Sequence, residues 1–129
     1  MGLVDRQIIF SYEIAKLIIA MHDLGYGVRL GDAWRSTDPL ILPNVSTKAS
    51  YQELLVLNGK SKVKYSKHND RLAIDLLLMR NDILVAEEEY RQFGVYWEGR
   101  GGIWGGRFGV KPEDYAIKIG WDSNHFEWM

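Results

Sequence analysis

No cysteine occurs among the 129 residues of the chain. This absence excludes disulfide scaffolds, thiolate nucleophiles, iron–sulfur clusters and zinc sites with cysteine ligands. Histidine is scarce as well, with three residues in all. Any metal-binding or nucleophilic chemistry must therefore use histidine, aspartate, glutamate, serine or water.

The chain also lacks a long apolar run. Charged or titratable residues interrupt the otherwise apolar first 24 residues: Asp5, Arg6, Glu13, Lys16, His22 and Asp23. No stretch reaches the roughly 18 apolar residues of a membrane span, and no basic leader with a small-residue cleavage site is recognisable. We expect a protein made in the cytoplasm without a signal peptide, whose export would need another route.

An excess of positive charge is missing too, because 16 Lys and Arg stand against 17 Asp and Glu, a net charge of −1. No global field therefore attracts nucleic acid or an anionic membrane. One local basic run is formed by Lys60, Lys62, Lys64, Lys67 and Arg71. We interpret it as a solvated loop, or as a site for an anionic cell-wall polymer, rather than as a nucleic-acid patch.

The composition, with 47% apolar and 26% charged residues, is typical of one globular domain spanning residues 1–129. A second domain would be too small to hold its own core. Near the N-terminus, apolar residues recur at alternating steps of four and three: Phe10, Ile14, Leu17, Met21 and Leu24. This spacing predicts an amphipathic helix with Glu13, Lys16 and Asp23 on the side away from the core, ended by Gly25.

Weaker patterns predict the remaining elements. We expect strands over 28–30 and 72–78, helices over 50–58 and 87–93, a loop over 39–47, and a glycine-rich loop region over 94–109. Residues 121–129 favour a turn followed by a short terminal strand. Because helices and strands do not alternate as parallel βαβ units would, the predicted fold class is α+β, with a small, mostly antiparallel sheet and packed helices.

Asp75 is anomalous because it lies in the middle of the apolar run LAIDLLL. A carboxylate there would be desolvated unless a cation or strong donors hold it. An arginine partner would suffice, but His68 precedes Asp75 by seven residues and His125 follows it. Two histidines and one aspartate form a reasonable three-ligand set for zinc, with water as the fourth ligand. Because seven is an odd step, the loop over 69–71 must bend to bring His68 and Asp75 together.

Two acids flank His125 in the terminal segment WDSNHFEW. In a strand, His125 and Glu127 share a face. Metal-assisted hydrolysis needs a carboxylate close to the attacking water. Asp122 is the first candidate for this base and Glu127 the second, although Asp122 would also suit a turn cap and Glu127 a partner that orients an imidazole. Arg35, in a polar loop, is a candidate for binding a substrate carboxylate or an oxyanion, with an ordinary loop arginine as the alternative.

Several segments together resemble a known family. Ser66-Lys67-His68, Ala73-Ile74-Asp75 and the run 122–127 look like the SxH, AxD and DxxHFE pieces of the zinc-dependent DD-peptidase-like family. That family includes D-alanyl-D-alanine carboxypeptidases and phage L-alanyl-D-glutamate endolysins. The resemblance extends from about Trp34 to the C-terminus and includes Arg35-Ser36, a helix over 52–59 and the WGG segment at 104–106.

The resemblance implies a family fold and a site. It implies zinc ligands at His68, Asp75 and His125, a catalytic base at Asp122 and a substrate-contacting Arg35. Two departures matter. Arg71 stands where many members have glycine, which we interpret as a different loop path close to that of small phage-encoded members. Asp122 stands where many members have glutamate, which favours endopeptidase over dipeptidase action.

We therefore predict a zinc metallopeptidase that hydrolyses an amide bond of the peptidoglycan stem peptide with zinc-bound water as nucleophile. An L-alanyl-D-glutamate endopeptidase of the phage-lysis type is the first reading, which a holin would release to the cell wall. A D-alanyl-D-alanine carboxypeptidase, or a non-catalytic zinc-stabilised binding module for cell wall or a protein partner, is the alternative. We expect one ion per chain and a monomer. The bond cut, the host wall and the choice of zinc over another divalent ion stay open.

Overall fold

The computed structural model describes residues 1–33, 39–40, 49–50 and 67–129. Two α-helices lie in this part of the chain, α1 (Leu3–Asp23) and α3 (Arg91–Gly99). The strands are β1 (Gly27–Leu30), β2 (Pro39–Leu40), β3 (Ala49–Ser50), β4 (Ala73–Arg80), β5 (Ile83–Leu84), β6 (Ile103–Trp104) and β7 (His125–Glu127). Short 3-10 helices are η1 (Lys67–Asp70), η2 (Glu87–Tyr90), η3 (Gly105–Arg107) and η4 (Pro112–Asp114). None of the described helices is long and apolar enough to cross a membrane.

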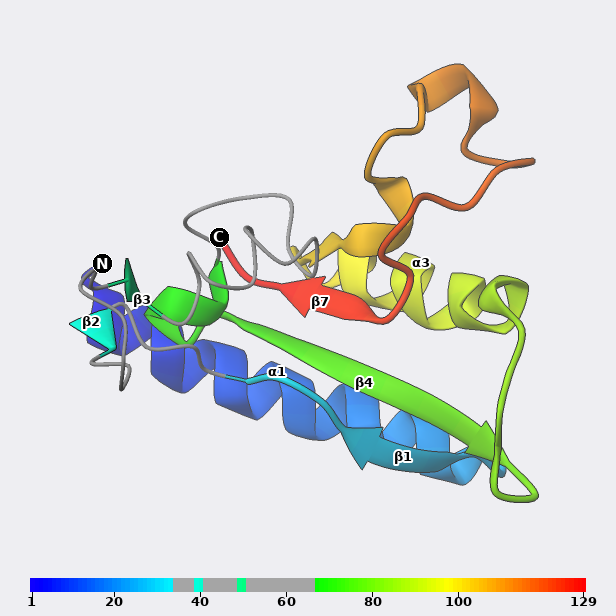
Figure 1. Ribbon diagram of the computed structural model, residues 1–129, viewed down its shortest axis with the longest axis horizontal. Coiled ribbons are helices and arrows are strands. Elements are labelled where there is room, and N and C mark those ends of the chain that lie inside the picture. Colours follow the sequence, from blue (N-terminus) through cyan, green and yellow to red (C-terminus); the bar gives the residue numbers. More distant parts are fainter. Residues whose placement is uncertain (34–38, 41–48, 51–66) are drawn as a thin grey trace, which may run out of the picture.

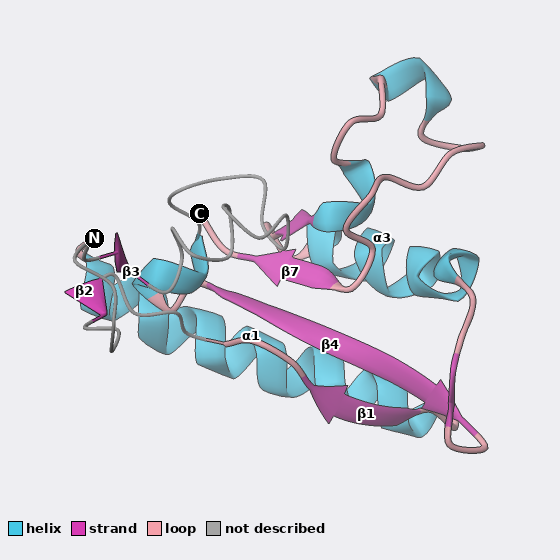
Figure 2. Ribbon diagram, viewed as in Figure 1, coloured by secondary structure: helices cyan, strands magenta, loops and turns pink. Residues whose placement is uncertain are grey.

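The main sheet is antiparallel throughout and has the order β1-β4-β7-β6, with β5 paired to β4 (Figure 2). β4 is its long central strand, because β1 pairs with its second half and β7 with its first three residues. A small antiparallel sheet with helices confirms the predicted α+β class. A separate two-residue pair, β2 with β3, lies where we expected a loop and the start of a helix. The rest of the predicted helix over 50–58 lies outside the described residues.

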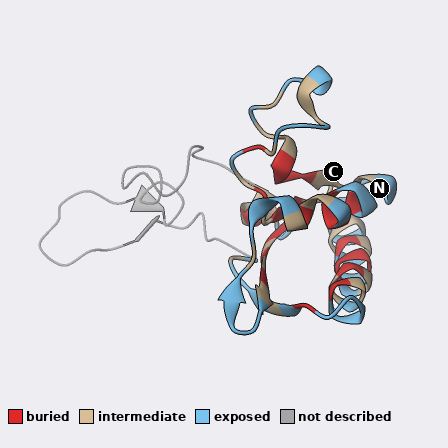
Figure 3. Cartoon of the chain, turned by 90° about the vertical axis from the view of Figure 1, so that its right-hand side faces the viewer, coloured by how far each residue is buried: buried red, intermediate tan, exposed pale blue. Residues whose placement is uncertain are grey.

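β4 separates the core from the opposite face of the sheet. Its residues Ile74, Leu76 and Leu78 are buried, whereas Asp75 and Leu77 between them are half-buried. Such alternation is expected, because successive side chains of a strand point to opposite faces. The buried set packs with the buried face of α1 and with the aromatic residues of α3, where these elements face one another (Figure 3). Asp75 therefore points away from the hydrophobic core.

Helix α1 has the predicted buried face, and Phe10, Ile14, Leu17 and Met21 are all buried. Two expectations for this helix were wrong. Leu24 lies beyond the last helical residue and is 58% exposed, so the helix ends before it can point inward. The chain also buries a charged side chain that the spacing placed on the solvent side.

That side chain is Glu13, which is 7% exposed. Its two carboxylate oxygens accept hydrogen bonds from Nε and Nη2 of Arg100, both 2.9 Å long. Because α3 packs beside α1 and ends next to Arg100, the buried face of α1 is wider than the apolar residues alone indicate. The ion pair with Arg100 offsets much of the free energy that is needed to remove the Glu13 carboxylate from water, whereas an unpaired carboxylate at this position would strongly destabilise the fold.

The glycine-rich region is more helical than expected. The predicted helix over 87–93 is a 3-10 turn followed by α3, which continues to Gly99. Gly94 lies within α3, where the indole ring of Trp104 packs against it. A Cβ atom at Gly94 would lie 2.1 Å from that ring, so the position has no room for a side chain. Trp97 and Trp104 are fully buried. Beyond them, the segment coloured orange projects from the body of the molecule before the chain returns to β7 (Figure 1).

Candidate metal centre

Strand pairing brings Asp75 and His125 together. In the antiparallel register of β4 and β7, Asp75 lies directly opposite His125. Directly opposite residues point to the same face, with Cβ atoms about 5 Å apart. The backbone of Asp75 is held on its other edge, where its N–H donates to Asp32 O at 2.9 Å and its carbonyl accepts from Gly31 N at 2.8 Å. The carboxylate thus stands on a strand fixed along both edges.

His68 reaches the same place from the 3-10 turn η1. The turn closes with two backbone bonds, Leu72 N–H to Lys67 O at 2.9 Å and Arg71 N–H to His68 O at 3.3 Å. These two bonds form a Schellman motif, in which the residue that follows the C-cap adopts a left-handed backbone conformation. Arg71 is that residue and has φ +58°. The bend over 69–71 that the odd spacing required is confirmed. The chain then enters β4, and His68 Nε2 comes to lie 3.3 Å from Asp75 Oδ1.

Arg71 stands where many members of the resembling family have glycine, and our interpretation of it as a sign of a different loop path stays a prediction. The structure gives Arg71 the left-handed conformation that glycine adopts at no steric cost. The arginine side chain therefore does not prevent the turn that places His68.

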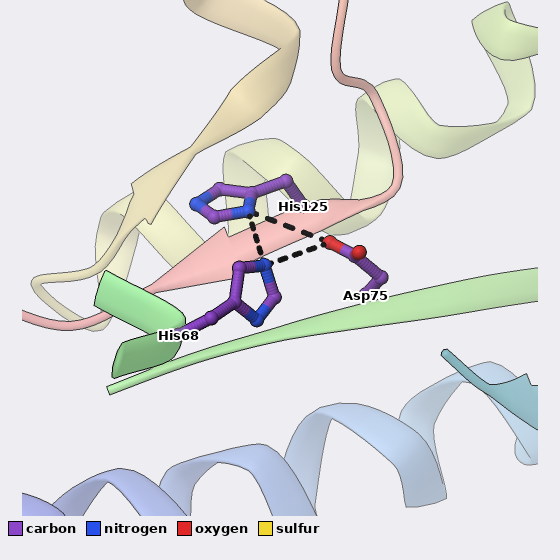
Figure 4. A group of neighbouring side chains, drawn as sticks. All are labelled: His68, Asp75 and His125. Carbon is purple, nitrogen blue, oxygen red and sulfur yellow. Dashed lines mark hydrogen bonds and ion pairs between the residues drawn. The ribbon is translucent and has the colours of Figure 1, made fainter. Parts of the chain in front are cut away.

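Three ligand-type atoms converge at this point (Figure 4). His68 Nε2 lies 3.2 Å from His125 Nδ1 and 3.3 Å from Asp75 Oδ1, and His125 Nδ1 lies 3.4 Å from the same oxygen. Both imidazoles are buried, at 2% and 5% exposure. Within the described residues these three form a group that could hold a metal ion.

Hydrogen bonds alone cannot account for all three contacts. Each imidazole nitrogen carries at most one hydrogen, and an ionised carboxylate oxygen only accepts. At most two edges of the triangle can be hydrogen bonds, and if both nitrogens donate to Asp75, two N–H groups face each other across 3.2 Å. A cation at the centre of the three atoms removes this conflict, because all three then offer lone pairs.

The size of the triangle fits a small divalent ion. Tetrahedral zinc with ligand bonds of about 2.0 to 2.1 Å separates neighbouring ligand atoms by about 3.3 to 3.4 Å. The observed separations run from 3.2 to 3.4 Å. Two nitrogens and one carboxylate oxygen also match the ligand types that zinc accepts, with a fourth position open. The residues present therefore fit the ion.

The electrostatics of the metal-free site favour a cation. Burial alone would raise the pKa of Asp75, but hydrogen bonds from His125 and His68 lower it from 3.8 to about 2. Burial alone would lower the pKa of His125, but its contacts with Asp75 and Glu127 raise it from 6.5 to about 9. Acidic oxygens around His125 thus stabilise a positive charge, which a proton supplies when no metal does.

Glu127 holds the far side of the His125 ring. Its Oε1 lies 2.9 Å from His125 Nε2, which confirms that the two residues share a face of β7. In neutral His125 an N–H at Nε2 donates to Glu127, and the lone pair is left on Nδ1, the nitrogen in the triangle. Such a carboxylate partner fixes the tautomer and orientation of an imidazole ligand.

Asp122 lies beside the group. Its Oδ2 is 3.7 Å from His125 Nδ1, and its side chain is 29% exposed. A tight turn positions it, with His125 N–H donating to Asp122 O at 3.0 Å. The buried indole of Trp104 donates to Ser123 O in the same turn at 2.7 Å. The carboxylate therefore stands next to the triangle on an anchored turn.

Two glycines that the sequence did not single out as site residues allow this packing. A Cβ atom at Gly105 would lie 2.1 Å from Asp122 O and 2.8 Å from His125 Cβ. A Cβ atom at Gly31 would lie 2.9 Å from Asp75 Cβ. The WGG segment was part of the family resemblance, but only the fold reveals that its first glycine admits the turn over 122–125.

Other predicted features cannot be placed. Arg35 and Ser66 lie outside the described residues, as do the predicted helix over 52–59 and the basic run from Lys60 to Lys64. Of the five predicted site residues, the structure brings together His68, Asp75, His125 and Asp122.

Comparisons with known proteins show a likeness in fold. The chain matches no protein-family model and no curated protein sequence. Among solved structures it is similar to the Serratia marcescens L-Ala D-Glu endopeptidase ChiX, with a TM-score of 0.58 and 18% sequence identity. The likeness covers 91% of this chain and 78% of that one. The chain therefore shares the fold of a known endopeptidase.

Proposed function

We propose that the protein is a zinc-dependent peptidoglycan peptidase that hydrolyses an amide bond of the stem peptide, with the L-alanyl-D-glutamate bond as its target. The observation that carries the proposal is the triangle of His68, Asp75 and His125 with its 3.2 to 3.4 Å edges. The fold shared with an L-Ala D-Glu endopeptidase supports both the reaction and the bond.

In this proposal His68, Asp75 and His125 hold one zinc ion. When bound, zinc would lower the pKa of a water molecule and polarise the scissile carbonyl, which is the help that an unactivated amide needs at neutral pH. Asp75 supplies the negative charge that offsets the ion. Glu127 keeps the Nδ1 lone pair of His125 directed at the ion.

Asp122 is the proposed base. It lies 3.7 Å from His125 Nδ1, on the side of the ring that faces the triangle, whereas Glu127 contacts the opposite nitrogen. This arrangement favours Asp122 over Glu127 for taking the proton of the attacking water and returning it to the leaving amine. The sequence-based role of Arg35, binding a substrate carboxylate or stabilising the oxyanion, completes the proposal.

The place of action follows from the substrate. A peptidase of this type acts at the bacterial cell wall, and release by a holin is our proposal for how it reaches the wall. The alternative of a non-catalytic binding module needs no base beside the metal ligands. A partly exposed Asp122 on an anchored turn favours catalysis.

The experiment is mass spectrometry of defined muropeptides incubated with the zinc-loaded protein. The Asp122→Asn variant should retain one metal per chain and lose about 100-fold or more of turnover, the usual range for a general acid–base group. The exposed Glu113→Gln variant is the matched control and should cut like the wild type. A chelated sample should be inactive.

The fragment masses identify the bond. Cleavage between L-alanine and D-glutamate supports the proposal, and release of terminal D-alanine alone replaces it with carboxypeptidase action. Full activity of Asp122→Asn would refute the assignment of the base. If no fragments form although one metal per chain is present, the binding module becomes the better explanation.

A further inference from the structure

Helix α1 carries a second apolar face that the fold leaves uncovered. Val4, Ile8, Tyr12 and Ile19 are 66%, 62%, 62% and 59% exposed. At 100° per residue they fall, with the exposed Ala15, within an arc of about 80°. Phe10, Ile14, Leu17 and Met21, which face the core, lie on the other side of the helix. We call the five residues Val4, Ile8, Tyr12, Ala15 and Ile19 the outer stripe.

The outer stripe is too regular for scattered surface apolar residues. Its spacing is four, four, three and four residues, over about four turns of the helix, which is the pattern of a helix face that packs against another helix. Single exposed apolar residues need no explanation, but a continuous apolar strip marks a contact surface. The core does not use this face, because it is filled from the opposite side.

The charges beside the outer stripe identify the partner. Asp5 and Lys16 lie on the same flank of the stripe, eleven residues apart, or about 16 Å along the helix. The other flank carries Ser11 and His22. Lys16 also lies over the Tyr12 ring at 4.3 Å and 3.9 Å from Glu13, so its ammonium stays beside the stripe.

We propose that α1 is the interface of a homodimer in which two copies of the helix pack antiparallel through the outer stripe. In an antiparallel pair, equal flanks of the two helices face each other. Asp5 of each copy then lies within about one turn of Lys16 of the other, which gives two equivalent ion pairs. The same arrangement places Val4 opposite Ile19 and Ile8 opposite Ala15. The stripe is thus complementary to itself.

Two other arrangements fit less well. A parallel pair would set the charged flank of one helix against Ser11 and His22 of the other and would form no ion pair. A membrane-surface helix carries Lys and Arg beside its apolar face, whereas the flank here ends in Asp5 and Asp23. A second copy in antiparallel orientation is therefore the occupant that both the charges and the spacing favour.

The proposed interface leaves the metal centre open. α1 packs on the face of β4 that carries Ile74, Leu76 and Leu78, and Asp75 points to the opposite face. Dimerisation and metal binding are therefore separable, and the dimer does not depend on the proposed function. Our sequence-based expectation of a monomer is the alternative that the tests below decide.

The first test is the mass in solution, measured by sedimentation velocity over a concentration series. The wild type should pass from monomer to dimer as concentration rises. The Ile8→Glu variant should weaken the dimer at least about tenfold, because it places a charge in the apolar interface opposite Ala15 of the other copy. Ile117→Glu, at a residue 75% exposed outside the stripe, is the control and should associate like the wild type. Far-UV circular dichroism verifies that both variants are folded.

The second test fixes the orientation. Because the chain has no cysteine, single cysteines can report one contact each. The Val4→Cys and Ile19→Cys variants should each fail to form a disulfide with themselves but should cross-link when mixed, since a disulfide needs Cα atoms within about 7 Å. Self-linking of Val4→Cys would overturn the antiparallel arrangement. A wild type that stays monomeric at millimolar concentration would overturn the dimer itself.

Discussion

The carboxylates of Glu13 and Asp75 are both largely removed from solvent, but they have different partners. Glu13 in α1 is paired with Arg100, whose two N–H groups each reach one carboxylate oxygen at 2.9 Å. Asp75 in β4 is approached by two imidazoles through the same oxygen, Oδ1, and the imidazole nitrogens also touch each other.

The chemistry of the partner explains the difference. A guanidinium is always charged, and its planar fork fills both oxygens of a carboxylate. Nothing more can bind between Glu13 and Arg100. An imidazole can present either a hydrogen or a lone pair. Protons can therefore satisfy at most two of the three contacts among Asp75, His68 and His125, whereas a divalent ion can be bound by all three side chains.

The largest expected difference between the two carboxylates is in zinc affinity. Asp75→Asn removes the negative ligand and should lower zinc affinity by more than about 100-fold, beyond the range typical of residues behind the ligands. Glu13→Gln should leave zinc affinity unchanged within about twofold, because Glu13 lies on the far side of the sheet. Titration against a competing chelator measures both. Equal losses would show that zinc binds elsewhere, or that both variants are misfolded.

A second prediction compares the effect on stability of alanine at Gly105, beside the candidate metal centre, and at Gly99, beside the Glu13–Arg100 pair. Gly105→Ala should cost about 2 to 3 kcal/mol of unfolding free energy, because the new Cβ would lie 2.1 Å from Asp122 O. It should also weaken zinc binding by displacing His125. Gly99→Ala, next to Arg100, meets nothing within 4 Å and should be neutral or stabilise by up to about 1 kcal/mol. Urea unfolding checks both, and a tolerant Gly105 would contradict the close packing of the turn.

In the metal-free protein, His125 and Asp75 should make the stability depend on pH in different ranges. The pKa of His125 is raised from 6.5 to about 9, so its contribution to stability is complete below pH 6.5 and is lost as pH rises towards 9. The pKa of Asp75 is lowered from 3.8 to about 2, so its contribution is lost only as pH falls below 3.8.

The chelated protein should therefore lose on the order of 2 kcal/mol between pH 6.5 and 9. Zinc should raise Tm more at pH 8 than at pH 6, because the ion displaces the proton from His125. Thermal unfolding with chelator or with zinc measures this. A flat Tm for the chelated protein over this range would contradict the raised pKa of His125.

The sequence was informative about Asp75 and silent about Glu13 for a physical reason. A charge inside a short apolar strand is an anomaly that local sequence reveals, and the two scarce histidines pointed to its partners. A glutamate in an amphipathic helix is ordinary, and its partner Arg100 lies 87 residues away. Only the packing of α3 against α1 brings the two together.

The same limit explains the other differences. The α+β class with a small antiparallel sheet was predicted from the order of the helices and strands, whereas the register of the strands was not predicted. The packing of Trp104 against Gly94 and the contact of Gly105 with Asp122 depend on neighbours distant in sequence. Local pattern therefore locates the chemistry of the candidate site, whereas tertiary contacts decide how closely its parts approach.

The smallest effect tests whether Glu13 has only a structural role. Its hydrogen bonds from Arg100 lower its pKa below 4.5, so its stabilisation is present above pH 4.5 and is lost as pH falls through the lowered value. Glu13→Gln should lower Tm by a few degrees at pH 7, and the difference from the wild type should shrink on acidification. Thermal unfolding of both chelated proteins from pH 7 to pH 3 measures it. A difference that persists at pH 3 would assign the effect to packing around residue 13 instead of charge, and the contrast with Asp75 would then rest on metal binding alone.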